Sequence, residues 1–317
     1  ILSAENIAKT KKGVRIINCA RGGLVDEAAL AEAIKSGHVA GAGFDVFAVE
    51  PAKDSPLFGL DNVVCTPHLG ASTTEAQENV ALQVAEQISD YLMTGAVQNA
   101  LNMPSVTAEE AKVMGPWIKL ATHLGAFIGQ LTDEPIEEVN ILLDGAAAEM
   151  NVKALDCAVI AGMLKPVVSE VNMVSAPVIA ADRGIKTSIT TQAKSGPFDA
   201  DIKLRVKMPS RERSIAGTVF ADGKPRFIMI KGITIDAEIG QHMLYTTHKD
   251  VPGIIGALGA TMGAHGVNIA NFTLGRTVSG GDAIALLYVD APVPDLVLEE
   301  LRKTELFQMV SPLEFEV

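Results

Sequence analysis

The first third of the chain alternates short apolar runs with segments of helical periodicity. The apolar runs are continuous rather than alternating, which is typical of strands in a parallel sheet that is covered on both faces. They span residues 14–19, 39–45 and 63–65. The helical segments span residues 3–11, 26–37 and 72–95. Ser3 and Asp26 are predicted to cap the first two helices. This order predicts an α/β fold, the C-terminal half of a doubly wound, Rossmann-type parallel sheet.

The middle of the chain predicts a separate α+β domain. A linker over residues 97–104 precedes a helix predicted over residues 109–132. Two further helices are predicted over residues 154–164 and 176–183. Strands are predicted over residues 137–143, 186–193, 202–207, 213–220 and 226–230. The elements do not alternate regularly, which favours an α+β architecture.

The C-terminal part predicts a β-α-β-β-α-β unit, the order of a ferredoxin-like fold. Its strands are predicted over residues 243–247, 268–276, 283–289 and 308–316. Its helices are predicted over residues 254–264 and 295–303. We therefore predict three domains, over residues 1–96, 97–241 and 242–317.

The composition excludes some classes of partner. A formal net charge of −12 disfavours nucleic acid and anionic membrane surfaces, because both need a basic face on the protein. No apolar run approaches the roughly 20 residues that a transmembrane helix needs. Cys19, Cys65 and Cys157 form no metal-binding or redox spacing. We therefore expect no metal site, and we predict a reduced, cytoplasmic location.

The N-terminal part lacks the glycine-rich turn that opens a dinucleotide-binding fold. Gly41-Ala42-Gly43 has neither the third glycine nor a helix after it. The chain also starts at Ile1, without Met, directly before a helical pattern. We therefore expect a piece of a longer protein. We also expect this piece to be inactive by itself, because half of its cofactor site is missing.

Charged side chains follow the ends of the three predicted strands. Arg21 follows the first strand, and His68 follows the third. Asp45 and Glu50 both follow the second. Because the carboxyl ends of parallel strands meet at one edge of a sheet, where ligands bind in open α/β folds, we expect these side chains around one crevice. Taken singly, each has an ordinary interpretation as a solvated arginine, a loop carboxylate or a histidine that caps a turn.

This set of side chains suits the oxidation of a 2-hydroxy acid. The reaction needs a base for the hydroxyl proton, a cation for the carboxylate and a hydride acceptor. Histidine can be the base because its pKa lies near neutrality. A neighbouring glutamate can orient the ring and favour its charged form. Arginine offers a planar fork to a carboxylate, and Gly22 and Gly23 allow the backbone to approach a ligand closely.

Three segments resemble signature sequences of the D-isomer-specific 2-hydroxyacid dehydrogenases. They span residues 14–23, 41–51 and 67–73. The longer string TPHLGASTTEAQENV, over residues 66–80, is similar to the version found in phosphoglycerate dehydrogenases. The resemblance implies that Arg21 binds the substrate carboxylate or carbonyl oxygen, that His68 is the acid/base and that Glu50 is its partner.

The same resemblance implies NAD as the cofactor. Asp45 is expected to hold the nicotinamide carboxamide, and backbone on either side of the crevice is expected to lie along the nicotinamide end. The implied cofactor-binding residues are Cys19, Ala20, Arg21, Asp45, His68, Leu69, Gly70 and Ala71.

The C-terminal part carries polar residues around the turn that starts its first helix. The turn is Pro252-Gly253, and Asp250 and Asn268 could grip the charged ends of an amino acid together with free helix amides. Alternatively, Asp250 caps the helix and Asn268 lies in a turn at the entry of a strand. Residues 248–256 with 266–271 resemble an ACT domain. The resemblance implies L-serine as an effector that binds His248, Asp250 and Asn268.

Residues 102–241 resemble the intervening domain of type I phosphoglycerate dehydrogenases, most recognisably over 174–185. Lys224, Arg226 and Lys231 are candidate anion-binding cations there, or else solvated surface charges.

The resemblances together imply NAD-dependent oxidation of 3-phospho-D-glycerate to 3-phosphohydroxypyruvate. This is the first step of L-serine biosynthesis, carried out by a homotetramer with serine feedback. One alternative is another D-2-hydroxyacid dehydrogenase, of the glyoxylate or hydroxypyruvate reductase type. A second alternative is a non-catalytic, amino-acid-sensing fragment. The two domains after the dehydrogenase core argue against the first alternative, because such reductases usually end soon after that core.

Overall fold

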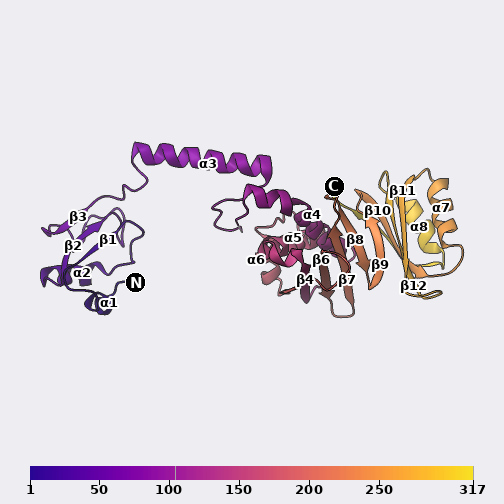
Figure 1. Cartoon of the computed structure of the whole chain (residues 1–317), viewed down its shortest axis with the longest axis horizontal. Helices are drawn as coiled ribbons and strands as arrows, with labels where there is room; N and C mark the ends of the chain where they lie inside the picture. Colours follow the sequence, from indigo (N-terminus) through magenta and orange to yellow (C-terminus); the bar gives the residue numbers. More distant parts are fainter. Residues whose placement is uncertain (104, 317) are drawn as a thin grey trace. The chain divides into compact units, whose positions relative to one another are not determined.

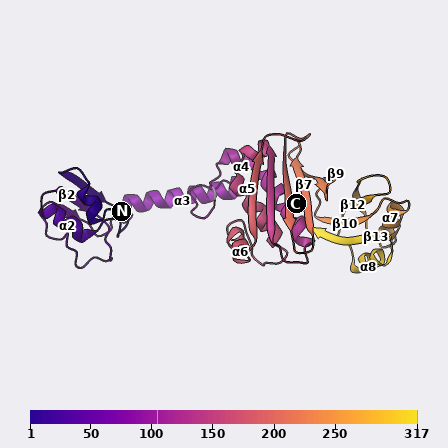
Figure 2. The same cartoon turned by 90° about the horizontal axis from the view of Figure 1, so that it is seen from below.

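The computed structural model describes residues 1–103 and 105–316 (Figures 1 and 2). The chain divides into two units, Ile1–Ser89 and Asp90–Val317. The predicted linker over 97–104 ends on Pro104, which lies outside the described residues. The predicted boundaries after residues 96 and 241 stay predictions.

The first unit contains a parallel sheet, as predicted. Its strands are β1 (Val14–Asn18), β2 (Val39–Phe44) and β3 (Val63–Cys65), in the order β1-β2-β3. Both strand pairs are parallel, so the three carboxyl ends lie at the same edge of the sheet. The predicted α/β fold class is confirmed.

Two helices of the first unit begin at the predicted caps. The Ser3 hydroxyl accepts a hydrogen bond from the Asn6 amide, 3.4 Å away, at the start of α1 (Ala4–Ala8). Asp26 accepts a hydrogen bond from the Ala29 amide, 3.0 Å away, at the start of α2 (Glu27–Lys35). α1 ends earlier than residue 11, the predicted end, and the Thr10 hydroxyl beyond it donates to the carbonyl of its last turn. Local caps therefore set where these helices begin.

Only one face of this sheet is covered within the described residues, which corrects the prediction of a sheet covered on both faces. Ile16 packs on the covered face with Leu30 and Ile34 of α2. On the other face, Ile17 is 77% exposed and Val64 is 69% exposed. Side chains alternate between the two faces of a sheet along each strand, and α1 and α2 both pack on the same face. The other face is therefore left exposed.

A long helix, α3 (Thr74–Thr94), follows the sheet and has no buried residue. Its exposed apolar side chains are Val80, Leu82, Val84, Ile88, Tyr91, Leu92 and Met93. The boundary between the two units falls inside this helix. Among the residues that the structure describes, no helix is long and apolar enough to cross a membrane.

The second unit is built around a six-stranded sheet of order β5-β4-β6-β7-β8-β9. The strands are β4 (Glu138–Gly145), β5 (Lys186–Gln192), β6 (Ala200–Lys207), β7 (Glu212–Val219), β8 (Pro225–Ile230) and β9 (Ile233–Glu238). β9 was not predicted from the sequence. A two-residue turn, Lys231-Gly232, joins it to β8, and both turn residues have positive φ. Such a turn is a hairpin signal that can be read from sequence.

The helices on this sheet are α4 (Ala108–Gln130), α5 (Val152–Leu164) and α6 (Ala176–Asp182), and a short 3-10 helix spans Ala146–Glu149. α4 and α5 approach each other very closely. A Cβ atom on Gly125 of α4 would lie 2.1 Å from the Val159 carbonyl oxygen of α5, and one on Gly162 would lie 2.1 Å from the Thr122 carbonyl oxygen. Neither glycine therefore leaves room for a side chain.

The predicted β-α-β-β-α-β unit is present at the C-terminal end. Its elements are β10 (His242–Lys249), α7 (Ile254–Ala264), β11 (Ile269–Arg276), β12 (Asp282–Val289), α8 (Asp295–Lys303) and β13 (Phe307–Glu314). The antiparallel sheet has the order β11-β12-β10-β13. This is the ferredoxin-like arrangement that the order of elements predicts.

The two sheets of the second unit share a hydrophobic core. The rings of Phe127 in α4 and Tyr245 in β10 lie edge to face, with centroids 5.2 Å apart. Tyr245, Leu286 and Phe315 belong to the same buried cluster as Phe227 of β8. The opposite face of the C-terminal sheet packs on α7 and α8. Residues 90–317 therefore form one packed unit that contains both sheets.

His123 of α4 is buried in the second unit, and this burial has a consequence for pH. Its Nε2 lies 2.8 Å from the Glu316 carbonyl oxygen, and burial lowers the pKa of His123 below its usual 6.5. Below about pH 6.5, His123 of the unfolded chain therefore binds a proton, whereas His123 of the folded chain stays neutral to lower pH. We expect the free energy of unfolding to fall between pH 7.5 and pH 5.5.

Urea unfolding at the two pH values checks this expectation. In His123→Gln, whose amide can still donate to the Glu316 carbonyl, the loss on acidification should be smaller than in the parent. His265→Gln is the control, because His265 is less buried and lies 2.9 Å from the Glu300 carboxylate. An equal loss in His123→Gln and in the parent would contradict the assignment.

Candidate active site

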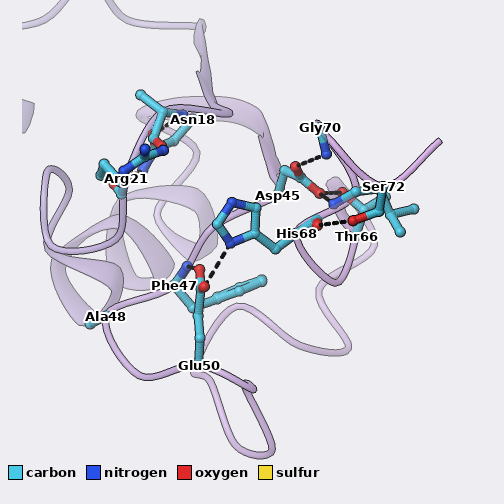
Figure 3. A network of polar contacts seen from close by, with 12 residues as sticks. Asn18, Arg21, Asp45, Phe47, Ala48, Glu50, Thr66, His68, Gly70 and Ser72 are labelled. Carbon is cyan, nitrogen blue, oxygen red and sulfur yellow. Dashed lines mark hydrogen bonds and ion pairs between the residues drawn. The ribbon is translucent and has the colours of Figure 1, made fainter. Parts of the chain in front are cut away.

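The loops after the three parallel strands bring the predicted charged residues to one edge of the sheet (Figure 3). Arg21 lies in the loop after β1, and Asp45 and Glu50 lie in the loop after β2. His68 lies in the turn after β3. Figure 3 shows the imidazole between the side chains of Glu50 and Asp45, with Arg21 on the neighbouring loop.

His68 and Glu50 form a direct pair. The His68 Nδ1 lies 2.7 Å from the Glu50 Oε2, and the Glu50 Oε1 accepts a hydrogen bond from the Phe47 amide, 2.9 Å away. The hydrogen bond from His68 and that from the Phe47 amide lower the pKa of Glu50. Because a carboxylate only accepts, the imidazole carries its proton on Nδ1. The Nε2 of neutral His68 is thereby left as a proton acceptor.

The turn that presents His68 is held by Asp45. Asp45 is 6% exposed, and its carboxylate accepts hydrogen bonds from the Thr66 hydroxyl at 2.5 Å, the Leu69 amide at 2.7 Å and the Gly70 amide at 2.9 Å. These bonds, first of all the one from Thr66, lower the pKa of Asp45. The structure therefore gives Asp45 the task of fixing this turn. Its expected contact with a nicotinamide stays a prediction.

His68 has a backbone conformation that L-residues rarely adopt. Its φ is 59°, in the left-handed region. Outside glycine, this region costs about 1–2 kcal/mol per residue and is concentrated at functional sites. The Asp45 hydrogen bonds to the next two amides hold the conformation in place. The strained backbone of His68 is therefore consistent with a functional role for its side chain.

The Arg21 loop is ordered by Asn18, a residue that the sequence analysis missed. The buried Asn18 side chain donates to the Arg21 carbonyl at 3.0 Å and accepts from the Ala20 amide at 3.2 Å. The Arg21 guanidinium is exposed and donates to the Ala20 carbonyl at 2.7 Å. No carboxylate among the described residues pairs with it. A polar residue at the end of a buried strand was the signal that could have identified Asn18.

The Arg21 loop rests on the loop that carries Glu50. A Cβ atom on Gly22 would lie 1.8 Å from the Phe47 carbonyl oxygen and 2.9 Å from the Ala48 amide nitrogen. Gly22 was expected to allow the close approach of a ligand, whereas the structure shows that it allows the close approach of the chain's own backbone. The two loops that supply the cation and the carboxylate therefore touch directly.

A cavity of about 530 Å³ lies beside the His68–Glu50 pair. It is lined by Phe47, Glu50, Pro51, Ala52, Phe58, Cys65, Thr66, Pro67 and His68. Most of these side chains are apolar, so the imidazole lies at the rim of a largely apolar cavity. The exposed backbone at 19–21 and 69–71 lies at the same strand ends, where the expected nicotinamide contacts fall. No cluster of possible metal ligands occurs in the described part of the chain.

The three predicted effector residues are each engaged by the chain itself. His248 is buried, and its Nδ1 lies 2.8 Å from the Lys249 carbonyl oxygen. Asp250 pairs with Arg276 at 2.7 Å, and this pairing lowers the pKa of Asp250. Asn268 donates to the Asp290 carboxylate at 2.7 Å. The alternative that Asp250 caps α7 is wrong, because the cap is Gly253 and no side chain bonds there.

Two of the candidate anion-binding cations are paired. Lys224 lies 3.7 Å from the Glu238 carboxylate. Arg226 lies near Asp222 and Asp236, and its guanidinium stacks over Phe220 at 5.1 Å. These contacts support the interpretation as an ordinary surface charge for Lys224, whose side chain is 62% exposed, but not for Arg226, whose side chain is 20% exposed.

Three family models match the chain in consecutive segments. The NAD-binding domain of D-isomer specific 2-hydroxyacid dehydrogenases matches residues 1–70. The D-3-phosphoglycerate dehydrogenase intervening domain matches residues 113–231, and the ACT domain matches residues 242–306. The sheet with its His68–Glu50 pair therefore lies in the segment that is similar to the NAD-binding domain of D-isomer specific 2-hydroxyacid dehydrogenases.

Curated relatives narrow this class. A D-3-phosphoglycerate dehydrogenase of Bacillus subtilis is 40% identical over 302 residues, which cover 95% of this chain and 58% of the relative. One of Synechocystis is 41% identical over 305 residues, covering 96% of this chain and 55% of the relative. Over nearly its whole length the chain is therefore similar to D-3-phosphoglycerate dehydrogenases. It spans just over half the length of these curated relatives.

Proposed function

We propose that the chain is part of an enzyme that oxidises 3-phospho-D-glycerate to 3-phosphohydroxypyruvate with NAD⁺, the first step of L-serine biosynthesis. The observation that carries the proposal is the His68–Glu50 pair, 2.7 Å apart at the carboxyl edge of a parallel sheet. Ligands of open α/β folds bind at that edge. The family match of residues 1–70 supports NAD as the cofactor, held along 19–21 and 68–71.

The chain's own residues divide the chemistry among them. His68 takes the proton of the substrate hydroxyl at Nε2, while its Nδ1–H stays on Glu50. The ionised Glu50 stabilises the imidazolium that forms. Arg21, which has no acidic partner among the described residues, binds the substrate carboxylate through its guanidinium fork. Residues 19–21 and 68–71 would hold NAD⁺, which would supply the acceptor for the hydride of the carbon that carries the hydroxyl.

A second candidate is another D-2-hydroxyacid dehydrogenase, such as a glyoxylate or hydroxypyruvate reductase. The catalytic residues do not separate these reactions, because both need a base, a cation and a hydride acceptor. The intervening-domain match over residues 113–231 favours 3-phosphoglycerate. A cytoplasmic location and a homotetramer stay predictions.

A hybrid protein tests the substrate. It joins this chain to the portion of the Bacillus subtilis relative that lies outside the match. We expect NADH formation with 3-phosphoglycerate and NAD⁺, and none from the chain alone. A folded hybrid that reduces glyoxylate but does not oxidise 3-phosphoglycerate would move the proposal to the second candidate. A folded hybrid without either activity would reject both.

We also propose that the ACT part binds L-serine as a feedback effector. The family match over residues 242–306 supports this. The Oδ2 of Asp250 accepts from Arg276 and from the Gly280 amide, so Oδ1 is the atom that would accept from the serine ammonium group. Calorimetric titration of the chain with L-serine should show binding heat, and Asp250→Ala should remove it. Asp282→Ala is a matched control, because Asp282 pairs with Lys249 at 2.6 Å in the same domain. Absence of heat with the parent chain would reject the effector.

A further inference from the structure

Glu27 makes two hydrogen bonds that neither helix formation nor the proposed chemistry requires. It is the first residue of α2, directly after the capping residue Asp26. Its Oε1 accepts a hydrogen bond from the Ala48 amide, 2.8 Å away. Its Oε2 accepts a hydrogen bond from the Ser55 hydroxyl, 2.7 Å away. One carboxylate thus reaches two points of a loop that is 21 and 28 residues distant in sequence.

These two points bracket Glu50. Ala48 precedes it, and the buried Ser55 follows it, so the loop between them is fastened at both ends. The Glu50 Oε1 also accepts from the Phe47 amide at 2.9 Å, which folds the carboxylate back onto the start of the same loop. Gly22 packs against that start from the Arg21 loop. The position of the Glu50 carboxylate therefore depends on how this loop is held.

Glu27 is itself on a rigid support. Leu30, Ala31 and Ile34 on the buried side of α2 pack in the core of the first unit. A carboxylate in the first turn is also stabilised by the helix dipole. Glu32 provides a contrast on the same helix, because it is exposed and, among the described residues, its carboxylate pairs only with Lys35, at 2.9 Å.

We infer that Glu27 is a positioning residue for His68: by fastening both ends of the loop that carries Glu50, it fixes the carboxylate that holds the imidazole proton on Nδ1. The inference deepens the proposed function and rests on it for its catalytic meaning. The route runs from Glu27 to the loop, from the loop to Glu50, and from Glu50 to His68. Glu27 acts through these contacts and does not itself contact the substrate.

The chemistry of the two contacts predicts how variants differ. Glu27→Ala removes both acceptors and leaves the Ala48 amide without its partner. Glu27→Gln can keep both contacts, because its carbonyl oxygen accepts from Ala48 and its amide donates to the Ser55 hydroxyl oxygen. Glu27→Gln should therefore rescue what Glu27→Ala loses. Glu32→Ala removes the same charge from the same helix without touching the loop.

Nitrogen-15 NMR of the His68 imidazole in the chain tests the inference without any assay of turnover. In the parent and in Glu32→Ala, neutral His68 should be predominantly the Nδ1–H tautomer. In Glu27→Ala it should shift towards the Nε2–H tautomer, and in Glu27→Gln it should stay close to the parent. An unchanged His68 tautomer in a folded Glu27→Ala overturns the inference. If Glu27→Ala does not fold, Ser55→Ala removes one fastening alone and must shift the tautomer in the same direction.

Turnover in the hybrid protein separates this inference from the proposed function. Glu27→Ala should lower kcat by up to roughly 100-fold with a smaller change in KM, because a small misplacement of a catalytic group can cost that much. An inactive parent hybrid with a tautomer shift would reject the function and keep the positioning. An active hybrid in which Glu27→Ala changes neither kcat nor the tautomer would reject the positioning and keep the function.

Discussion

Replacing His68 by alanine is expected to lower kcat of the active hybrid protein by at least ~10²-fold, the lower end of the contribution of a general acid or base. The reason is geometric as well as chemical. The Nδ1 is held by Glu50 at 2.7 Å, so the opposite nitrogen is the one available to the substrate hydroxyl. No other imidazole lies in the cavity beside this pair among the described residues.

The control for this variant is His38→Ala. His38 precedes β2, at the opposite edge of the sheet from the candidate site, and its Nε2 lies 3.1 Å from both the Thr10 hydroxyl and the Ile7 carbonyl oxygen. It should alter stability but leave kcat within a few fold. Steady-state rates of both variants over a range of 3-phosphoglycerate concentrations give the comparison. Near-normal turnover in His68→Ala would remove this residue from the acid/base task.

Replacing Gly125 by alanine is expected to destabilise the second unit by about 3 kcal/mol, the upper part of the usual range for an overpacked core. The new methyl group would lie 2.1 Å from the Val159 carbonyl oxygen and 2.8 Å from the Met163 amide nitrogen. Both are backbone atoms, so no side chain can turn away to make room. α4 and α5 would have to separate, and the core that they close would open with them.

Gly259→Ala in α7 is the matched control for this helix-packing variant. A Cβ atom there would meet nothing within 4 Å, so the alanine should stabilise its helix by about 0.5–1 kcal/mol. The chain has a single tryptophan, Trp117, and it is buried in α4. Its fluorescence during urea unfolding therefore reports on the second unit. A Gly125→Ala midpoint equal to that of the parent would show that the two helices can adjust.

Much of the fold could be predicted from local signals. The predicted bounds of α7 and α8 agree with the structure, because each helix begins at a turn with Pro or Gly and has a defined periodicity. Continuous apolar runs identified the parallel strands, and their order placed the strand ends together. β9 was missed because the turn signal Lys231-Gly232 was not used, although its residues alternate between buried and exposed positions as a half-buried strand does.

The residues of the candidate site could be predicted from the sequence, but the contacts that hold these residues in place could not. Arg21, Glu50 and His68 could be placed at one edge because topology alone brings strand ends together. The contacts that hold them join residues far apart in sequence, as Glu27 and Ser55 show, and no local pattern encodes them. The pairing of Asp250 with Arg276 was hidden for the same reason, because it depends on the register of the C-terminal sheet.

The shortness of β3 determines how this site would come apart. The strand has three residues and none is fully buried, so its packing on the core is only partial, and the contacts of Asp45 with the turn that follows help to hold it in place. Contacts of this kind can be lost one at a time, whereas a packed core melts as a whole. Fraying of this edge would therefore detach the imidazole while the rest of the first unit stays folded, and loss of turnover on warming would precede loss of helical signal.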